Sequence, residues 1–184
     1  MRPTLALFLL SLAPAWSQVA KPAALASSNL PAPKAARIPA QAIGELEKAF
    51  NNRLMTMAGV DEAVDLLGDT RGVQLEDYGV VFTTEVSLVR TPGIMPMRPK
   101  IPPALAAHVH ELRVERLPLL KTAMTEMMRN MAAAFTQIPA SHQLVLVVRL
   151  YYGSWEDTTG MPSQVIMRAD RANTAAGKIE TEER

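Results

Sequence analysis

Four polar residues of this sequence could form a ligand site if the fold brings them together. Glu85, Arg149 and Arg168 lie in three segments with the alternating pattern of β-strands, and Tyr151 follows two positions after Arg149. Side chains two positions apart on a strand point to the same face of a sheet. If these faces coincide, a carboxylate, a phenol and two guanidinium groups converge on a site for an anion. We favour a second interpretation, in which the charges form ion pairs between strands on a solvated face.

The sequence contains no recognisable metal site or catalytic motif. His108 and His110 resemble an H-x-H pair, but positions two apart on a helix point in nearly opposite directions, and His142 lies in a loop. The nine glycines form no phosphate-binding loop, and no cysteine is present for thiol catalysis. Ser154 lacks the following glycine of a G-x-S-x-G elbow. We therefore expect no metal, no cofactor and no catalytic residue, and a binding protein rather than an enzyme.

Two segments carry apolar side chains that suit contacts with another protein. Residues 90–103 contain five prolines, which exclude regular structure, and the apolar side chains of Ile94, Met95 and Met97. The loop 153–162 adds Trp155. Flexible methionines and an aromatic anchor are typical of adaptable binding surfaces, although such side chains also fold back onto a core. For one methionine-rich helix face we favour the core: Met124, Met127, Met128 and Met131.

Apolar periodicity predicts the elements that must position these residues. Steps of three and four predict a helix over about 40–67, ended by Gly68, and a long helix over about 104–135 that Pro118 kinks or splits. Alternation predicts strands over 72–76, 78–89, 143–152 and 164–169, the third of them central. The expected fold class is α+β: a four-stranded, mostly antiparallel sheet with the long kinked helix and the N-terminal helix packed on it.

The charge and the cysteine content exclude several classes of partner. The chain has 19 basic and 18 acidic residues, a formal net charge of +1. Proteins that bind nucleic acid or an anionic membrane surface usually show a clear basic excess, so we expect neither partner. Without cysteine, no disulfide and no cysteine-linked lipid anchor can form.

The N-terminus predicts export from the cytoplasm. Arg2 supplies a positive charge, residues 5–12 form a short apolar segment, and Ala15 and Ser17 are the small residues that a signal peptidase accepts. The apolar segment is too short to anchor the chain permanently in a bilayer. We therefore expect cleavage after Ser17, a mature chain without a membrane span, and a periplasmic or secreted location.

The composition divides the chain into four parts. Residues 1–17 are the expected signal peptide, 18–40 an Ala- and Pro-rich flexible arm, 41–172 a single α+β domain and 173–184 a charged, frayed tail.

One run of residues resembles a known group of proteins. The segment 71–82, RGVQLEDYGVVF, is similar to a segment of exported bacterial proteins of unknown function, and the resemblance extends through the long helix to the loop 155–159, WEDTT. It implies a bacterial envelope setting and no particular activity. We therefore expect an exported, non-enzymatic module that binds another envelope protein. The alternative is an anion-binding protein or hydrolase that uses Glu85, Arg149, Tyr151 and Arg168.

Overall fold

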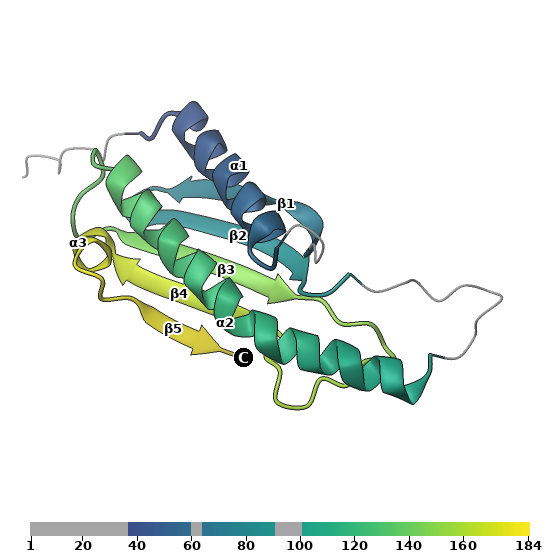
Figure 1. Ribbon diagram of the computed structural model, residues 1–184. Helices are drawn as coiled ribbons and strands as arrows, with labels where there is room; N and C mark the ends of the chain where they lie inside the picture. Colours follow the sequence, from purple (N-terminus) through teal and green to yellow (C-terminus); the bar gives the residue numbers. More distant parts are fainter. Residues whose placement is uncertain (1–36, 60–63, 91–100) are drawn as a thin grey trace, which may run out of the picture. The chain divides into compact units, whose positions relative to one another are not determined.

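The computed structural model describes residues 37–59, 64–90 and 101–184. These residues form a five-stranded sheet and three helices, with α1 and α2 lying over the same face of the sheet (Figure 1). The elements follow in the order α1 (Ala40–Thr56), β1 (Asp65–Leu75), β2 (Gly79–Ser87), α2 (Pro103–Ala134), β3 (Gln143–Leu150), β4 (Gln164–Asp170), α3 (Arg171–Ala175) and β5 (Glu180–Glu183).

The sheet is mixed, and its spatial order is β1-β2-β3-β4-β5. β2 and β3 run parallel, whereas the other three pairings are antiparallel. Two parallel neighbours need a crossover connection, and α2 supplies it. The predicted α+β class and the central position of β3 are confirmed, but the sheet has five strands rather than four. The fifth strand, β5, lies in the C-terminal residues that were expected to be frayed.

The predicted helix over 40–67 is wrong in its second half. α1 ends at Thr56, Gly59 follows with a positive φ of 98°, and β1 begins at Asp65. The apolar residues Val64 and Leu67 fit the helical stripe by coincidence of spacing. Val64 is buried and Leu67 is exposed, which a shared helix face would not produce.

α2 is one helix that includes Pro118, so the chain does not split there. A proline inside a helix removes one backbone donor and clashes with the preceding turn, and the two halves of α2 run in different directions in Figure 1.

The core lies between the sheet and the two long helices. Phe50 and Leu54 come from α1, and the ring of Phe82 on β2 stacks on Phe135 with ring centroids 6.2 Å apart. The methionine-rich face of α2 is core, as predicted: Met124, Met127, Met128 and Met131 are buried.

α1 also covers the edge strand β1. The Asn51 Oδ1 atom accepts hydrogen bonds from the backbone N–H of Thr70 (3.0 Å) and from its hydroxyl (2.6 Å). Glu47 Oε1 accepts from the Gly72 N–H at 2.7 Å. Edge strands with open backbone groups are liable to pair with other chains. Two such groups of β1 are instead bonded to side chains of α1.

Candidate functional site

One face of the sheet carries no helix among the described residues, and we call it the open face. Alternate residues of the strands point towards it, because side chains alternate along a strand. Five aliphatic residues occupy two adjacent rows of register partners there and form what we call the aliphatic strip: Val73, Val81 and Val145 in one row, and Val147 and Ile166 in the next. Val73 at one end is 54% exposed, whereas Val145 in the middle is buried by its neighbours.

A depression of about 640 Å³ lies at one end of the aliphatic strip. Glu85, Arg149 and Gln164 are register partners on β2, β3 and β4, and they line it side by side. Tyr151, two residues beyond Arg149, also lines it and is 50% exposed. The remaining lining residues are Leu150, Tyr152 and Ser163. The structure therefore brings together three of the four polar residues that the sequence singled out.

Arg168, the fourth, does not join this depression. Arg168 lies on β4, and its register partner on β3 is Val145, towards the end of β3 that is farther from Arg149. The Arg168 Nε atom lies 2.9 Å from Glu180 Oε2. For Arg168 the interpretation as an ion pair between neighbouring strands applies. By contrast, no hydrogen bond or ion pair joins the Arg149 or Glu85 side chain to another described residue.

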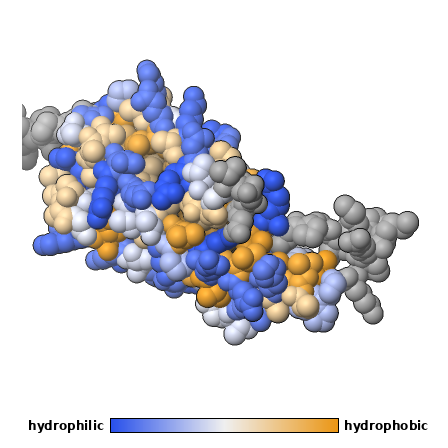
Figure 2. All heavy atoms as spheres, in the orientation of Figure 1, coloured by the Kyte–Doolittle hydropathy of each residue, from blue (hydrophilic) through white to orange (hydrophobic). Residues whose placement is uncertain are grey.

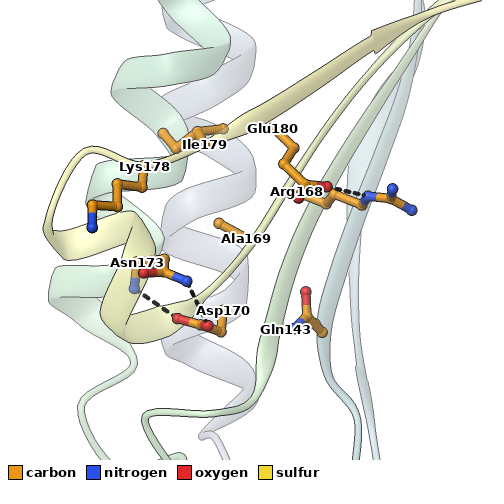
Figure 3. A pocket seen from close by; sticks show the side chains of 8 residues that line it. All are labelled: Gln143, Arg168, Ala169, Asp170, Asn173, Lys178, Ile179 and Glu180. Carbon is orange, nitrogen blue, oxygen red and sulfur yellow. Dashed lines mark hydrogen bonds and ion pairs between the residues drawn. The ribbon is translucent and has the colours of Figure 1, made fainter.

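A second depression, of about 340 Å³, surrounds the turn from β4 through α3 to β5 (Figure 3). Its polar groups mostly satisfy one another. Arg168 pairs with Glu180, and the Asp170 carboxylate accepts from the Asn173 backbone N–H (2.6 Å) and side-chain amide (2.8 Å). In Figure 3 the Lys178 side chain points away from both pairs. These contacts explain the shape of the C-terminal turn without a ligand.

A buried ion pair lies behind the first depression. The side chains of Arg113 on α2 and Glu156 in the β3–β4 connection are 0% and 2% exposed, and Arg113 Nη2 lies 2.6 Å from Glu156 Oε2. Arg113 also donates to Ser87 Oγ (3.1 Å) and to the Tyr151 carbonyl (3.2 Å). Its guanidinium carbon is 4.9 Å from the centroid of the Tyr152 ring, a cation–π geometry.

This environment shifts two pKa values. Burial lowers the pKa of Arg113, and the carboxylate of Glu156 opposes that shift. Burial also raises the pKa of Tyr152 to about 12, with the Arg113 charge opposing the shift. The Tyr152 hydroxyl donates to the Pro162 carbonyl at 2.6 Å. The raised pKa keeps the Tyr152 hydroxyl protonated and neutral at neutral pH.

Sequence reasoning missed Arg113, although a signal was present. The buried positions Val109, Arg113, Arg116 and Leu120 follow helical steps of four, three and four. Two basic residues thus occupy the apolar stripe of α2. A charge in such a stripe requires a buried partner, and the acidic residues of the 153–162 loop were the available candidates.

The remaining predicted residues do not form a site of their own. Trp155 is partly buried, and its indole Nε1 lies close to Gly153. Ile94, Met95 and Met97 lie outside the described residues. His108 is exposed beside Glu111, and His110 Nδ1 is 3.0 Å from the Asp157 carbonyl. No group of three metal-ligating side chains occurs in the part of the chain that the structure describes.

The groups that line the first depression can bind a ligand through hydrogen bonds and charge. The Ser163 hydroxyl donates to the Arg184 carbonyl at 3.0 Å, so no base activates it. The other groups are an arginine, a carboxylate, an amide and two phenols beside aliphatic side chains.

The helical side of the molecule looks different. Hydrophilic residues cover most of it, with apolar residues gathering mainly towards the N-terminal half of α2 (Figure 2). On α2 the exposed apolar side chains include Val114 and Leu119. None of the helices in residues 37–59 and 101–184 combines the length and apolar content that crossing a membrane requires.

Comparison of this chain with protein-family models, with curated proteins and with solved structures gives no match, so a functional assignment depends on the residues described above.

Proposed function

We propose that this chain is an exported, non-catalytic module that binds another protein of the cell envelope through the open face of its sheet. The observation that carries the proposal is that two exposed side chains, Tyr151 and Arg149, lie together at the end of the aliphatic strip. Tyrosine and arginine are among the residues that most often dominate the binding energy of protein interfaces. An apolar centre beside a polar rim is the usual anatomy of such an interface.

The charges of the open face also suit a protein partner. Arg168 is neutralised by Glu180, and Arg149 is opposed by a carboxylate at its register partner Glu85, so these charges balance and offer little to attract nucleic acid or an anionic lipid surface. The export part of the proposal depends on the first 17 residues, whose charge, apolar segment and small residues have the order of a signal peptide.

Site-specific photocrosslinking tests the binding surface. A photoreactive residue replaces Thr83, on the open face of β2, in the exported full chain. We expect it to capture one defined protein, and we expect the additional change Arg149→Ala to reduce the yield at least about tenfold, since interface arginines often contribute more than 1.4 kcal/mol.

Two control positions on the helical side make the experiment decisive. Arg129 is an exposed polar position of α2, and Val114 is an exposed apolar one. Capture of the same protein from Arg129 would mean unspecific contact. Capture from Val114 but not from Thr83 would place the interface on α2 and contradict the proposal.

Mass spectrometry of the protein recovered outside the cytoplasm tests export. We expect Gln18 as the first residue, and an intact Met1 on cytoplasmic protein would contradict this part.

A second candidate function is the binding of a small anion at Arg149. It is favoured by the lack of a hydrogen bond or ion pair from the Arg149 guanidinium to any described residue. A thermal-shift series with inorganic phosphate and citrate tests it. A rise in melting temperature that Arg149→Ala abolishes, and that Arg71→Ala on the same face leaves unchanged, would favour this candidate over a protein partner.

A further inference from the structure

Arg113 contacts the segments that border the depression from inside the molecule. It lies on α2, donates to Ser87 at the end of β2 and to the carbonyl of Tyr151, and stacks against the Tyr152 ring. Tyr151 and Tyr152 both line the depression. One guanidinium group thus bridges the crossover helix, the end of β2 and the start of the β3–β4 connection.

Glu156 and Tyr152 fix the rest of that connection. Glu156 binds Arg113 through Oε2 and accepts the Gly153 backbone N–H through Oε1 at 3.1 Å. The Tyr152 hydroxyl donates to the Pro162 carbonyl, next to Ser163, which lines the depression. The start and the end of the connection are therefore tied to the same buried cluster.

The cluster lies at the border of the main apolar core, against which Tyr152 and Met161 pack as partly buried side chains. The fully buried side chains that α2 contributes to that core begin at Leu120, and Val109 is buried outside it. The polar contacts of Arg113, together with that of His110 to the Asp157 carbonyl, link the N-terminal half of α2 to the β3–β4 connection. Weakening them should loosen this region before the sheet, because regions with few buried apolar contacts open first.

We propose that Arg113 is a positioning residue: its buried ion pair with Glu156 holds residues 151–163 in the conformation that presents Tyr151 beside Arg149. We call this ion pair the clamp. The proposal depends on the proposed function, because the clamp supports the surface that the partner would contact. A fork-shaped guanidinium suits this role, since it reaches Ser87, Tyr151 and Glu156 at once, which a lysine cannot do.

Trp155 lies within the clamped connection and reports on it directly. The chain has two tryptophans, so Trp16→Phe in the full chain leaves Trp155 as the single fluorophore. In this background we expect Arg113→Met to raise acrylamide quenching of Trp155 at least about twofold. Hydrogen exchange of the 153–161 amides should accelerate at least about tenfold more than that of the Leu144–Val148 amides in β3, which exchange mainly when the whole domain unfolds.

Three further variants separate positioning from folding. Glu156→Gln keeps the size of the side chain and removes its charge, so it tests the clamp if Arg113→Met does not fold. Arg113→Lys should give a smaller rise in quenching. Arg116→Met is the matched control, because Arg116 is also buried on α2 and donates to the Leu88 carbonyl at 2.8 Å; it should leave Trp155 unchanged.

Two results would overturn the clamp itself. One is unchanged Trp155 quenching and exchange in a folded Arg113→Met or Glu156→Gln chain. The other is an equal rise of exchange in β3, because Arg113 would then support the sheet as a whole.

A photoreactive residue at position 151 then links the clamp to binding. Capture of the partner should fall in Arg113→Met. Unchanged capture with an opened connection would overturn the positioning role and leave the proposed function intact. No capture from the unaltered chain would contradict the proposed function, while the Trp155 measurements would still decide the clamp.

Discussion

A guanidinium group without exposed surface is costly, and at Arg113 the surrounding contacts offset part of that cost, although Nε has no hydrogen-bond partner among the described residues. The group exchanges water for the Glu156 carboxylate, two oxygen acceptors and an aromatic ring. Removing one partner of a buried ion pair typically costs about 3–5 kcal/mol, because the other charge stays buried without compensation. Replacing both partners by apolar side chains of similar volume is often neutral or stabilising.

We therefore expect the double variant Arg113→Met, Glu156→Leu to be more stable than either single variant. Each single change should lower the free energy of unfolding by about 3–5 kcal/mol, and the double change should recover most of that loss. Urea unfolding of the four chains measures the coupling. Losses that simply add would mean that the two charges do not depend on each other.

Tyr152 makes the stability depend on pH in the alkaline range. Its pKa is about 12 in the folded chain, whereas an unfolded tyrosine titrates near 10. A group whose pKa is raised on folding stabilises fully below its unfolded pKa, and the contribution is lost as pH rises through the folded pKa. Between about pH 10 and 12 the folded chain should therefore lose stability.

Tyr152→Phe should flatten this loss, although it lowers stability at neutral pH by removing the hydrogen bond to Pro162. Denaturant unfolding at pH 9 and at pH 11 gives the slope for each chain, with Tyr151→Phe as the control. The same slope in Tyr152→Phe and in the unaltered chain would show that Tyr152 is not responsible.

The sequence could predict part of the site because strand alternation is a local property. Alternation alone places Arg149 and Tyr151 on one face. Glu85 is opposite Arg149, and Arg168 is opposite Val145, because of strand register. Register depends on pairings between distant segments, which no local pattern contains. The contact between Arg113 and Glu156 joins residues 43 positions apart, so only the folded chain reveals it.

At the level of the elements, α1 acts on its neighbour through polar side chains as well as through its apolar face. Asn51 satisfies the backbone and hydroxyl of Thr70, which is fully buried. Asn51→Ala should therefore cost about 1–3 kcal/mol, the usual penalty for leaving a buried donor without a partner.

Asn52→Ala is a matched control, since Asn52 is exposed on the same helix and both changes gain helix propensity equally. We expect it to stay within about 0.5 kcal/mol of the unaltered chain. Thermal unfolding distinguishes the two variants, and light scattering should detect association of Asn51→Ala alone, because its β1 edge has regained open donors. Equal stability of both variants would contradict the capping role of Asn51.

The junction of β2 and β3 requires a glycine. Gly79 has a positive φ of 141°, and a Cβ there would collide with the backbone oxygen of Gln143. Gly79→Ala should cost about 3 kcal/mol or more, since neither the backbone nor the neighbouring strand can yield easily. Gly44→Ala on α1 meets nothing within 4 Å and should stabilise by about 0.5–1 kcal/mol. Chemical denaturation measures the change in the free energy of unfolding for both variants. An unchanged stability of Gly79→Ala would contradict the register between β2 and β3.

The elements that local patterns misplaced have a common explanation. β1 begins among apolar residues that also fit a helix, and β5 consists of three glutamates and a threonine with no apolar alternation. Pairing with β2 and β4 decides both, so tertiary contacts override the local signal. The stronger local patterns gave correct predictions: the aliphatic run of β3 predicted a central strand, and the long apolar stripe of α2 predicted a long helix.

At the scale of the whole molecule, the sheet is a single layer whose central strand, β3, pairs in parallel with β2. We expect a chain that ends at Ala140, and so lacks β3, β4 and β5, to show no cooperative unfolding transition. Phe82 and Val86 would lose their neighbours on β3, and the hairpin of β1 and β2 would have too little apolar surface to bury. Circular dichroism during a temperature ramp measures this; a sharp transition in the fragment would contradict it.

The place of β3 in the chain has a consequence for the time at which folding can occur. The described residues before Gln143 form two helices and one hairpin, but the sheet has no central strand until β3 is available. Contacts between residues far apart in sequence form slowly, because loop closure must precede them. A ribosome-bound or translocating chain would therefore stay loose enough to thread through a narrow channel. The order of strands thus delays compaction until synthesis has passed the central strand.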